Sequence, residues 1–367
     1  MNHSQSYLEI DISKIRDNYK ILSSICKTSE VACVIKANAY GLGADKISNA
    51  LFHQEKCQNF FVASVNEAID LRKNLGLGAN IFVLNGVFRD EVDEFARHNL
   101  TPILNHLGQI ELWTEFTKKI EKRLPSILHI DTGMSRLGMP GIEVDKLISK
   151  SELLDILSLE YVMSHLSSSE EVENQYNLEQ LRKFKHYLKY FPKSKASLSN
   201  SSSIFLGKDY HFDLVRTGAA LYGINPNVSK PNIMHNVVKL TTPIIQLQKL
   251  SSSNFIGYNM TFTTKRNTIV ATLPIGYSDG YSRILSNCGE VFIDGHIVPV
   301  VGRVSMDLIT IDVTDVPSEK IFLGQKVEII NDYCTIDKIA SIVGTIGQEA
   351  LTILGGSRYN RIYKNNA

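Results

Sequence analysis

Four basic side chains follow short apolar segments in a pattern that suggests one shared site. Lys36 follows the run VACVI, and His165 ends the run VMSH. Arg136 lies in HIDTGMSRLG, and Arg216 ends FDLVR. If each run is a strand of one parallel barrel, the four side chains lie at the strand ends where barrel enzymes place their reactive groups. No matching cluster of carboxylates or metal ligands accompanies them, so the pattern is typical of an anion or cofactor site.

Lys36 is the residue whose surroundings most favour chemistry. Burial behind an apolar strand lowers the pKa of an ammonium group, and the neutral amine is the form that makes an imine with a carbonyl compound. A surface lysine is the alternative reading. Taken alone, His165 also fits a hydrogen-bonded core histidine, and Arg136 and Arg216 also fit partners of surface carboxylates. The four together favour a functional site.

The elements that would position these residues alternate from about residue 30 to residue 220. Segments such as VNEAIDLRKNLG and NQYNLEQLRKFKHYLKYF repeat apolar residues at helical spacing between the apolar runs. Strand–helix alternation predicts a parallel sheet, and about eight units over roughly 200 residues match a (β/α)8 barrel of the TIM type. An open doubly wound sheet is the alternative α/β fold. The runs predicted as strands cover residues 31–35, 60–65, 80–85, 100–104, 126–130, 154–165, 194–200 and 212–216.

The pattern of apolar and polar residues changes after about residue 228. NPNVSKPN has two prolines and several turn formers, as expected for a linker. VVKLTTPIIQLQKL, NTIVATLPIG and the apolar segments after them alternate apolar and polar residues between Gly and Asp turns, which predicts antiparallel strands. One helix is expected here, over TIDKIASIVG. We predict a barrel over residues 1–228 and a mainly antiparallel β domain over residues 229–367.

The composition narrows the class of protein. Of the 367 residues, 43% are hydrophobic, which is enough for sizeable cores and excludes a disordered chain. The 39 basic and 38 acidic residues give a formal charge of +1 without long runs of one sign. The charge distribution therefore offers no footprint for nucleic acid or an anionic membrane. A small-molecule enzyme is expected.

The cysteines and the N-terminal segment bear on the cellular compartment. Five cysteines without a CxxC pair are too few for a disulfide framework and do not predict structural zinc. The sequence shows neither a signal-peptide pattern nor a run of about 20 apolar residues. These features predict a reduced, cytoplasmic protein.

Five motifs, in this order and spacing, resemble those of the alanine racemase family. They are VIKANAYGLG, HIDTGMSRLG, FDLVRTGAALYG, LPIGYSDGYSR and VGRVSMD, and the likeness extends from YLEID to RYNRIY, essentially the whole chain. The family consists of fold-type III enzymes that depend on pyridoxal 5'-phosphate (PLP). The resemblance therefore implies a PLP cofactor and interconversion of L-alanine and D-alanine for peptidoglycan synthesis. It also implies a homodimer with shared active sites.

Carried over by position, the resemblance gives two residues catalytic roles. Lys36 would hold PLP as an imine, and Tyr258, supplied by the partner subunit, would be the second acid/base. Racemisation removes a proton from one face of the α-carbon and returns it to the other, which calls for two groups. In the family's usual assignment the lysine takes the proton from D-alanine and the tyrosine takes it from L-alanine. A tyrosine with the ordinary pKa of about 10 is a poor base, so nearby cations would have to favour its phenolate.

The remaining roles implied by the resemblance concern cofactor and substrate binding. Arg216 would donate to the pyridine nitrogen, because a guanidinium can only donate. An unprotonated ring is a weaker electron sink than a pyridinium, which disfavours transamination. The other cofactor-binding residues would be Tyr40, His165, Ser201, Gly218 and Ala219, and the substrate-binding residues would be Arg136, Tyr277 and Met306. A helix N-cap is the alternative reading of the serines at 201–203.

The chain departs from the family pattern at His129, at Ser305, where a cysteine is frequent, and near Tyr359. Many members carry a lysine where this chain has His129, and in some that lysine is carbamylated and braces the active-site arginine. Histidine forms no such carbamate, so Arg136 requires another partner, for which Asp131 and chloride are candidates. Tyr359 follows Arg358, whereas relatives often have a phosphate-contacting tyrosine before the arginine, so its role is open.

Three other kinds of PLP-binding protein match some of these motifs. A decarboxylase of this fold would set a carboxylate, rather than Arg216, against the pyridine nitrogen. A broad-specificity racemase would differ mainly in its pocket loops. A PLP-binding homeostasis protein resembles the barrel alone, whereas this chain adds residues 229–367 with Tyr258, Tyr277 and Met306.

Overall fold

The computed structural model describes residues 6–356 and 358–365, which form two units. Residues 16–39 and 43–234 make up the barrel unit. The described residues up to Ile15, residues 40–42 and those from His235 onward make up the β unit. Residues 1–5, part of the segment inspected for a targeting signal, and Ser357 lie outside the described residues.

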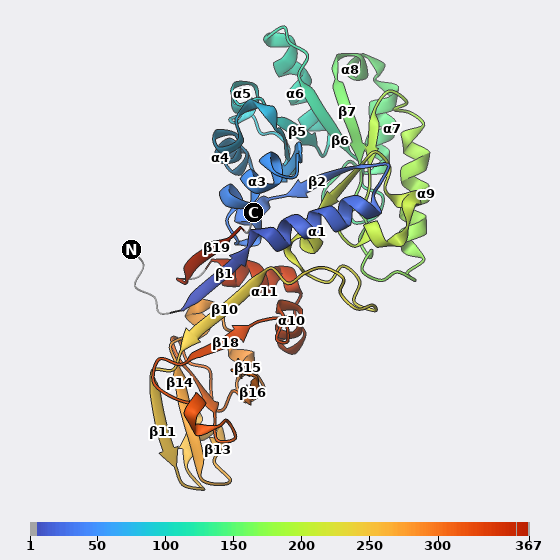
Figure 1. The fold of residues 1–367 in the computed structure, drawn as a ribbon. Coiled ribbons are helices and arrows are strands. Elements are labelled where there is room, and N and C mark those ends of the chain that lie inside the picture. The colour runs from blue at the N-terminus through green and yellow to red at the C-terminus, as the bar shows by residue number, and fades with distance from the viewer. Residues whose placement is uncertain (1–5, 357, 366–367) are drawn as a thin grey trace. The chain divides into compact units, whose positions relative to one another are not determined.

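The barrel unit is built on one eight-stranded parallel sheet (Figure 1). Its strands follow the order β8-β7-β6-β5-β4-β3-β2-β9. Backbone hydrogen bonds from Asp213 to Ala196 (3.0 Å) and from Arg216 to Ser199 (2.9 Å) bring the two ends of the sheet together. The predicted (β/α)8 barrel is confirmed, and the open doubly wound alternative is excluded. The strands are β2 (Glu30–Val34), β3 (Asn59–Val62), β4 (Asn80–Val83), β5 (Thr101–Leu104), β6 (Pro125–His129), β7 (Ser158–Met163), β8 (Lys195–Ser197) and β9 (Leu214–Thr217).

Apolar strand residues pack together inside the barrel, and amphipathic helices connect the strands. The buried cluster takes one or two side chains from each of seven strands, as expected for a filled barrel interior. Its buried members are Ala32, Phe61, Phe82, Ile103, Ile127, Tyr161, Met163 and Leu214. The longer helices are α1 (Ile12–Ile25), α3 (Ala44–His53), α4 (Val65–Leu75), α5 (Val92–Arg97), α6 (Leu107–Lys119), α7 (Gly141–Ser149), α8 (Ser151–Ile156) and α9 (Tyr176–Leu188). Among the helices of the described residues, none is long and apolar enough to cross a membrane.

The β unit contains a six-stranded sheet, a three-stranded sheet and a short hairpin. The six-stranded sheet has the order β16-β15-β18-β10-β1-β19, and all of its pairings are antiparallel except the parallel pair β1–β19. The mainly antiparallel β domain is confirmed. Its strands are β1 (Tyr7–Asp11), β10 (Val238–Pro243), β15 (Glu290–Ile293), β16 (His296–Pro299), β18 (Lys326–Ile330) and β19 (Asn360–Lys364) in the large sheet, β11 (Gln246–Leu250), β14 (Thr268–Leu273) and β17 (Ile309–Asp312) in the small sheet, and β12 (Phe255–Ile256) with β13 (Phe262–Thr263).

Three features of the β unit differ from the expectations. The predicted boundary after residue 228 placed the N-terminal segment in the barrel. In the structure, β1 belongs to the β unit, because it pairs with β10 and β19. The segment 237–250 is two strands in different sheets, because the chain leaves the large sheet after Pro243, which has no N–H for a further ladder bond. A second helix, α11 (Gly347–Gly355), follows the expected α10 (Ile336–Val343). Gly347 and Gly355 at its ends obscured its helical pattern.

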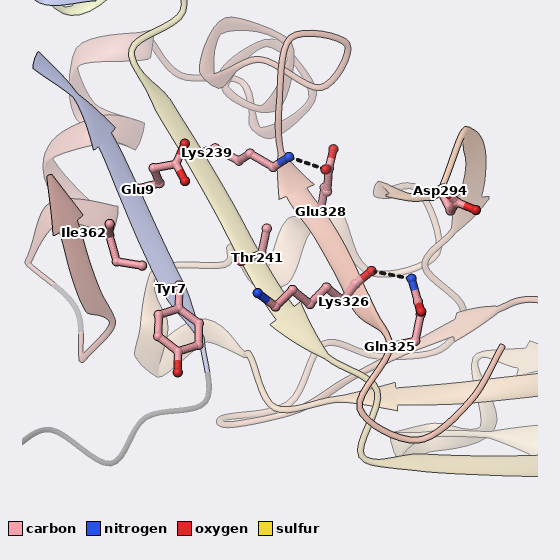
Figure 2. Close-up of a pocket in the computed structure, with 9 residues that line it drawn as sticks. All are labelled: Tyr7, Glu9, Lys239, Thr241, Asp294, Gln325, Lys326, Glu328 and Ile362. Carbon is pink, nitrogen blue, oxygen red and sulfur yellow. Dashed lines mark hydrogen bonds and ion pairs between the residues drawn. The ribbon is translucent and has the colours of Figure 1, made fainter. Parts of the chain in front are cut away.

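Polar side chains cover one face of the large sheet and line a cavity of about 360 Å³ (Figure 2). Two of its charges are paired between neighbouring strands, since Lys239 of β10 forms an ion pair with Glu328 of β18. Lys326 lies over the ring of Tyr7, with its nitrogen 5.8 Å from the ring centroid. Mixed, paired charges of this kind are typical of a solvated sheet face.

Gly276 offers a direct test of packing in the β unit. A Cβ atom at this position would lie 2.3 Å from the carbonyl oxygen of Met306 and 2.4 Å from that of Ser305. Because both contacts are with backbone, Gly276→Ala should destabilise the protein by about 1–3 kcal/mol, measured by urea unfolding. Gly356→Ala is the control, since its nearest contact is 3.5 Å away, and an unchanged unfolding midpoint for Gly276→Ala would contradict this packing.

Candidate active site

Lys36 lies directly after β2, where the backbone takes an unusual course. Residues 37–40 have φ values between 52° and 55°, so the chain makes a left-handed turn. Such a turn costs about 1–2 kcal/mol per residue for L-amino acids, and surrounding contacts must hold it. One of them is the hydrogen bond from Ala39 N–H to the Ile35 carbonyl (2.8 Å). The turn ends the strand abruptly and places Lys36 at its carboxyl end.

The ammonium group of Lys36 is half-buried, and within the described part of the chain it has no hydrogen bond or ion pair. Burial, followed by the positive charge of Arg136, lowers the pKa of Lys36, while the carboxylate of Glu67 opposes this effect. A lowered pKa increases the fraction of neutral amine, which is the nucleophilic form. The structure therefore gives Lys36 the shielded setting expected from the sequence.

Arg216 is a fixed, buried cation in β9, only 4% exposed. Its Nη1 donates to the Ser197 hydroxyl, and its Nη2 donates to the carbonyls of Ser164 (2.7 Å) and Leu198 (3.1 Å). Burial lowers the pKa of Arg216 to about 9, so the group stays protonated at neutral pH. The Nε–H has no acceptor among the residues that the structure describes, which leaves it available to a ligand.

His165, just beyond β7, is a neutral ring beside Arg216. Its Nδ1 lies 3.4 Å from Nη2 of Arg216. Because a guanidinium only donates, Nδ1 must accept, and the imidazole proton is on Nε2. Burial and the positive charges of Arg216 and Arg136 lower the pKa of His165 well below its usual range.

Arg136 lies in the loop after β6, and its side chain is exposed. No hydrogen bond or ion pair to another described residue engages its guanidinium. Asp131 does not pair with it, since its carboxylate accepts the backbone N–H groups of residues 133–135 at 2.9–3.1 Å. Asp131 shapes the loop that carries Arg136, and the guanidinium itself remains open to a ligand.

His129, at the end of β6, is held in one tautomer by Asn105. The Asn105 amide donates to the carbonyls of Leu84 and Ile103, both at 3.0 Å, so its oxygen faces Nδ1 of His129 at 2.8 Å. Nδ1 therefore carries the proton, and Nε2 is an acceptor. Burial, then the charge of Arg216, lowers the pKa of His129 to about 3, so the ring is neutral and supplies no negative charge to the site.

Ser201 forms hydrogen bonds with the segment that follows β9. Its Oγ accepts the N–H groups of Gly218 (2.9 Å) and Ala220 (3.2 Å). The hydrogen of the Ser201 hydroxyl has no acceptor in the described chain, and neither has the N–H of Ala219. The arrangement offers two donors to an anion, while the Gly218 N–H is already engaged.

The N-cap alternative for this serine stretch applies to a different residue. Ser203 N–H donates to the side-chain oxygen of Asn200 at 2.9 Å, and the Ser203 hydroxyl accepts the Asn200 N–H at 2.7 Å. The turn is therefore closed by Asn200 and Ser203, which leaves Ser201 free for another role.

Three predicted site residues lie in the β unit, on exposed turns. Tyr258 is 68% exposed, and its hydroxyl has no partner among the described residues. Backbone hydrogen bonds from Tyr277 to Ser305 (3.1 Å) and from Ser278 to Met306 (3.0 Å) bring Tyr277 and Met306 together. Tyr258 lies on a separate turn, the short helix Tyr258–Met260.

Two further tyrosines, Tyr40 and Tyr359, differ in the state of their hydroxyl groups. Burial raises the pKa of Tyr40 to about 12, so its hydroxyl remains a donor. Tyr359 is buried, and its hydroxyl donates to the Asp279 carbonyl at 2.6 Å.

Both halves of the chain match known protein families. The family model for the alanine racemase N-terminal domain matches residues 10–226, and the model for the alanine racemase C-terminal domain matches residues 237–363. The chain belongs to the alanine racemase family. An alanine racemase from Rickettsia akari is 59% identical over 356 residues, which cover 97% of this chain and 98% of that one.

Solved structures of alanine racemases have the same fold. The crystal structure of alanine racemase from Bartonella henselae, described as having covalently bound pyridoxal phosphate, matches with a TM-score of 0.94 and 40% identity over 98% of this chain and all of that one. The biosynthetic alanine racemase from Pseudomonas aeruginosa matches with a TM-score of 0.90 and 27% identity over 99% of this chain and all of that one.

The structure of this alanine racemase family member also shows supporting residues that the sequence analysis did not single out. Ser197 and Asn105 hold Arg216 and His129, and both are buried polar residues at strand ends. Their position directly before or after a predicted strand end was the available signal. Which partner each one would meet depends on neighbouring strands, so the sequence pattern did not reveal it.

Proposed function

We propose that this protein interconverts L-alanine and D-alanine with PLP as its cofactor, held through Lys36. The main support is the group of three cations at the carboxyl ends of the barrel strands. Lys36, Arg136 and Arg216 have no ion-pair partner among the described residues. In a barrel of the alanine racemase family, such a cluster fits an anionic cofactor and an amino-acid carboxylate.

The chemistry of the donors fits PLP. A neutral amine at Lys36 can bond to an aldehyde carbon, and the Arg216 Nε–H can donate to a ring nitrogen. Among the described residues, the hydroxyl of Ser201 and the N–H of Ala219 are donors without acceptors, and a phosphate group requires such donors. The proposed cofactor-binding residues are Lys36, Tyr40, His165, Ser201, Arg216 and Ala219, with Gly218 beside them holding the Ser201 hydroxyl oxygen through its N–H. The proposed substrate-binding residues are Arg136, Tyr277 and Met306.

The proposed mechanism uses two bases. When bound, PLP supplies an electron sink that acidifies the α-hydrogen of the amino acid. Lys36 removes or returns the proton on one face of the α-carbon, and Tyr258 does so on the other. Arg216 keeps its proton at neutral pH, so it donates without protonating the ring and limits competing transamination. Arg136 supplies a positive charge near Lys36 that favours the neutral amine.

A homodimer is part of the proposal. Tyr258, Tyr277 and Met306 are all exposed on the β unit, where side chains can meet a second copy of the chain. We propose that each active site combines Lys36 of one subunit with Tyr258 of the partner subunit, in a symmetric dimer. The proposed role is supply of D-alanine for peptidoglycan in the cytoplasm, with a small-molecule substrate and no nucleic-acid partner.

A D-alanine production assay tests the proposed function. Purified protein is incubated with L-alanine, with and without added PLP, and both enantiomers are quantified by chiral chromatography. We expect PLP-dependent formation of D-alanine, and serine and lysine as parallel substrates test for broad specificity. Absence of D-alanine in PLP-saturated samples would contradict the proposal.

The free hydroxyl of Ser201 predicts a specific effect on cofactor affinity. Ser201→Ala should weaken PLP binding about 10-fold, because a donor to the phosphate is lost, measured by absorbance titration of protein from which PLP has been removed. Ser199→Ala is the matched control, since the Ser199 hydroxyl already donates to the Tyr210 carbonyl (2.9 Å). Equal PLP affinity in wild type and Ser201→Ala would remove this contact from the proposal.

A further inference from the structure

Glu67 connects the helix after β3 to the backbone that follows Lys36. It lies in the first turn of α4, where it forms a capping box with Ser64. One carboxylate oxygen, Oε2, accepts the N–H groups of Ala63 (2.7 Å) and Ser64 (3.3 Å). The other, Oε1, accepts the N–H of Ala37 at 2.7 Å. A capping box requires only one of these oxygens, so the bond to Ala37 is additional.

The bond to Ala37 fixes the peptide group directly after Lys36. Ala37 is the first residue of the left-handed turn, a conformation that persists only when neighbouring groups hold it. On the other side of Lys36, Ile35 N–H donates to the Phe61 carbonyl at 2.8 Å. Lys36 is thus held between a strand ladder bond and a carboxylate, and the direction of its side chain is set by both.

Glu67 also contributes a charge. It is the carboxylate that acts on Lys36, against burial and the positive charge of Arg136. His165 is also close enough to Lys36 for their charges to interact, but the His165 ring is neutral and adds no charge. Removing the Glu67 charge leaves only influences that disfavour the ammonium form of Lys36.

We propose that Glu67 is a positioning residue for the reaction, which holds the strained turn after Lys36 and thereby aims the lysine amine. The inference rests on the proposed function, in which Lys36 is the reacting amine. Glu67 itself touches neither substrate nor cofactor in this role. A purely structural helix cap is the competing explanation.

Glu67→Gln and Ser64→Ala separate the two explanations. A glutamine offers one oxygen to three N–H groups, so its NH2 group must face at least one of them, and the anchor of Ala37 or the cap of α4 is lost. Ser64→Ala removes the cap partner on the same helix but leaves the carboxylate on Ala37. If Glu67 positions Lys36, Glu67→Gln should lower kcat about 10- to 100-fold with KM changed far less. Ser64→Ala should keep wild-type kcat.

A second experiment measures the pH dependence of Lys36 reactivity without requiring catalysis. The full-length chain, freed of PLP, is labelled with trace acetic anhydride across a pH series, and the Lys36 peptide is quantified by mass spectrometry. Glu67→Gln should move the labelling midpoint of Lys36 to lower pH, because the opposing charge is lost. Ser64→Ala should leave the midpoint in place, and Glu67→Asp, which keeps the charge but shortens the reach, should keep the midpoint while losing part of kcat.

The outcomes distinguish the two proposals. Equal kcat losses in Glu67→Gln and Ser64→Ala, or an unchanged kcat and midpoint in Glu67→Gln, would overturn the role of Glu67. If the wild-type protein makes no D-alanine, the proposed function fails whatever the variants do; if the wild type is active, kcat of Glu67→Gln compared with that of Ser64→Ala decides for or against the positioning role of Glu67.

Discussion

Tyr258→Phe should lower racemisation in both directions by about 10²- to 10⁴-fold, the range that a positioned acid–base group contributes. The substitution removes only a hydroxyl. Because the Tyr258 side chain is 68% exposed and its hydroxyl has no partner among the described residues, the stability of the subunit should not change. The effect would therefore report on chemistry, measured by chiral chromatography with saturating PLP.

Isotope exchange makes the test of Tyr258 more specific. In D2O, Tyr258→Phe should still exchange the α-hydrogen of D-alanine through Lys36, but it should exchange that of L-alanine far more slowly. Tyr333→Phe is the control, because Tyr333 is an equally exposed tyrosine of the β unit (72%) with no proposed role. Full activity of Tyr258→Phe would exclude the two-base mechanism.

Much of the barrel could be predicted because its signals are local. Each predicted strand from 31–35 to 212–216 overlaps an observed strand of the barrel, since a buried parallel strand is a short apolar run between turn residues. The β unit was less accessible. The pairing of β1 with β19 joins residues more than three hundred positions apart, and no local pattern near Tyr7 records such a partner.

In the candidate site, too, the features that depend on local sequence could be predicted and those that depend on distant contacts could not. Lys36, Arg216 and His165 were identified from their places after apolar runs, and the structure links them by charge and by a hydrogen bond. The left-handed turn at 37–40 was not predicted, because alanine and asparagine carry no signal that four successive residues will take positive φ. The hydrogen bond from Ala37 N–H to Glu67 could not be predicted either, because the spacing between Ser64 and Glu67 predicts only a helix cap.

Lys36→Ala should abolish racemisation, with a loss of at least about 10⁴-fold, because one side chain both holds the cofactor and moves a proton. The absorbance band at about 420 nm that PLP gives when bonded to a lysine amine should disappear. The band and the activity are separate readouts of the same amine. Lys46→Ala, at an exposed position in α3, should preserve both.

Added methylamine provides the decisive contrast for Lys36. The side chain removed from a half-buried position leaves room for a small primary amine at the end of β2. If Lys36 acts through its amine, methylamine should restore part of the α-hydrogen exchange in Lys36→Ala, and the rescue should grow with pH as more of the added amine is neutral. If Lys36 only supported the fold, methylamine would restore nothing and Lys36→Ala would unfold at a lower urea concentration than Lys46→Ala. A variant with wild-type stability, no 420 nm band and amine-dependent exchange would assign both the covalent and the proton-transfer role to this one nitrogen.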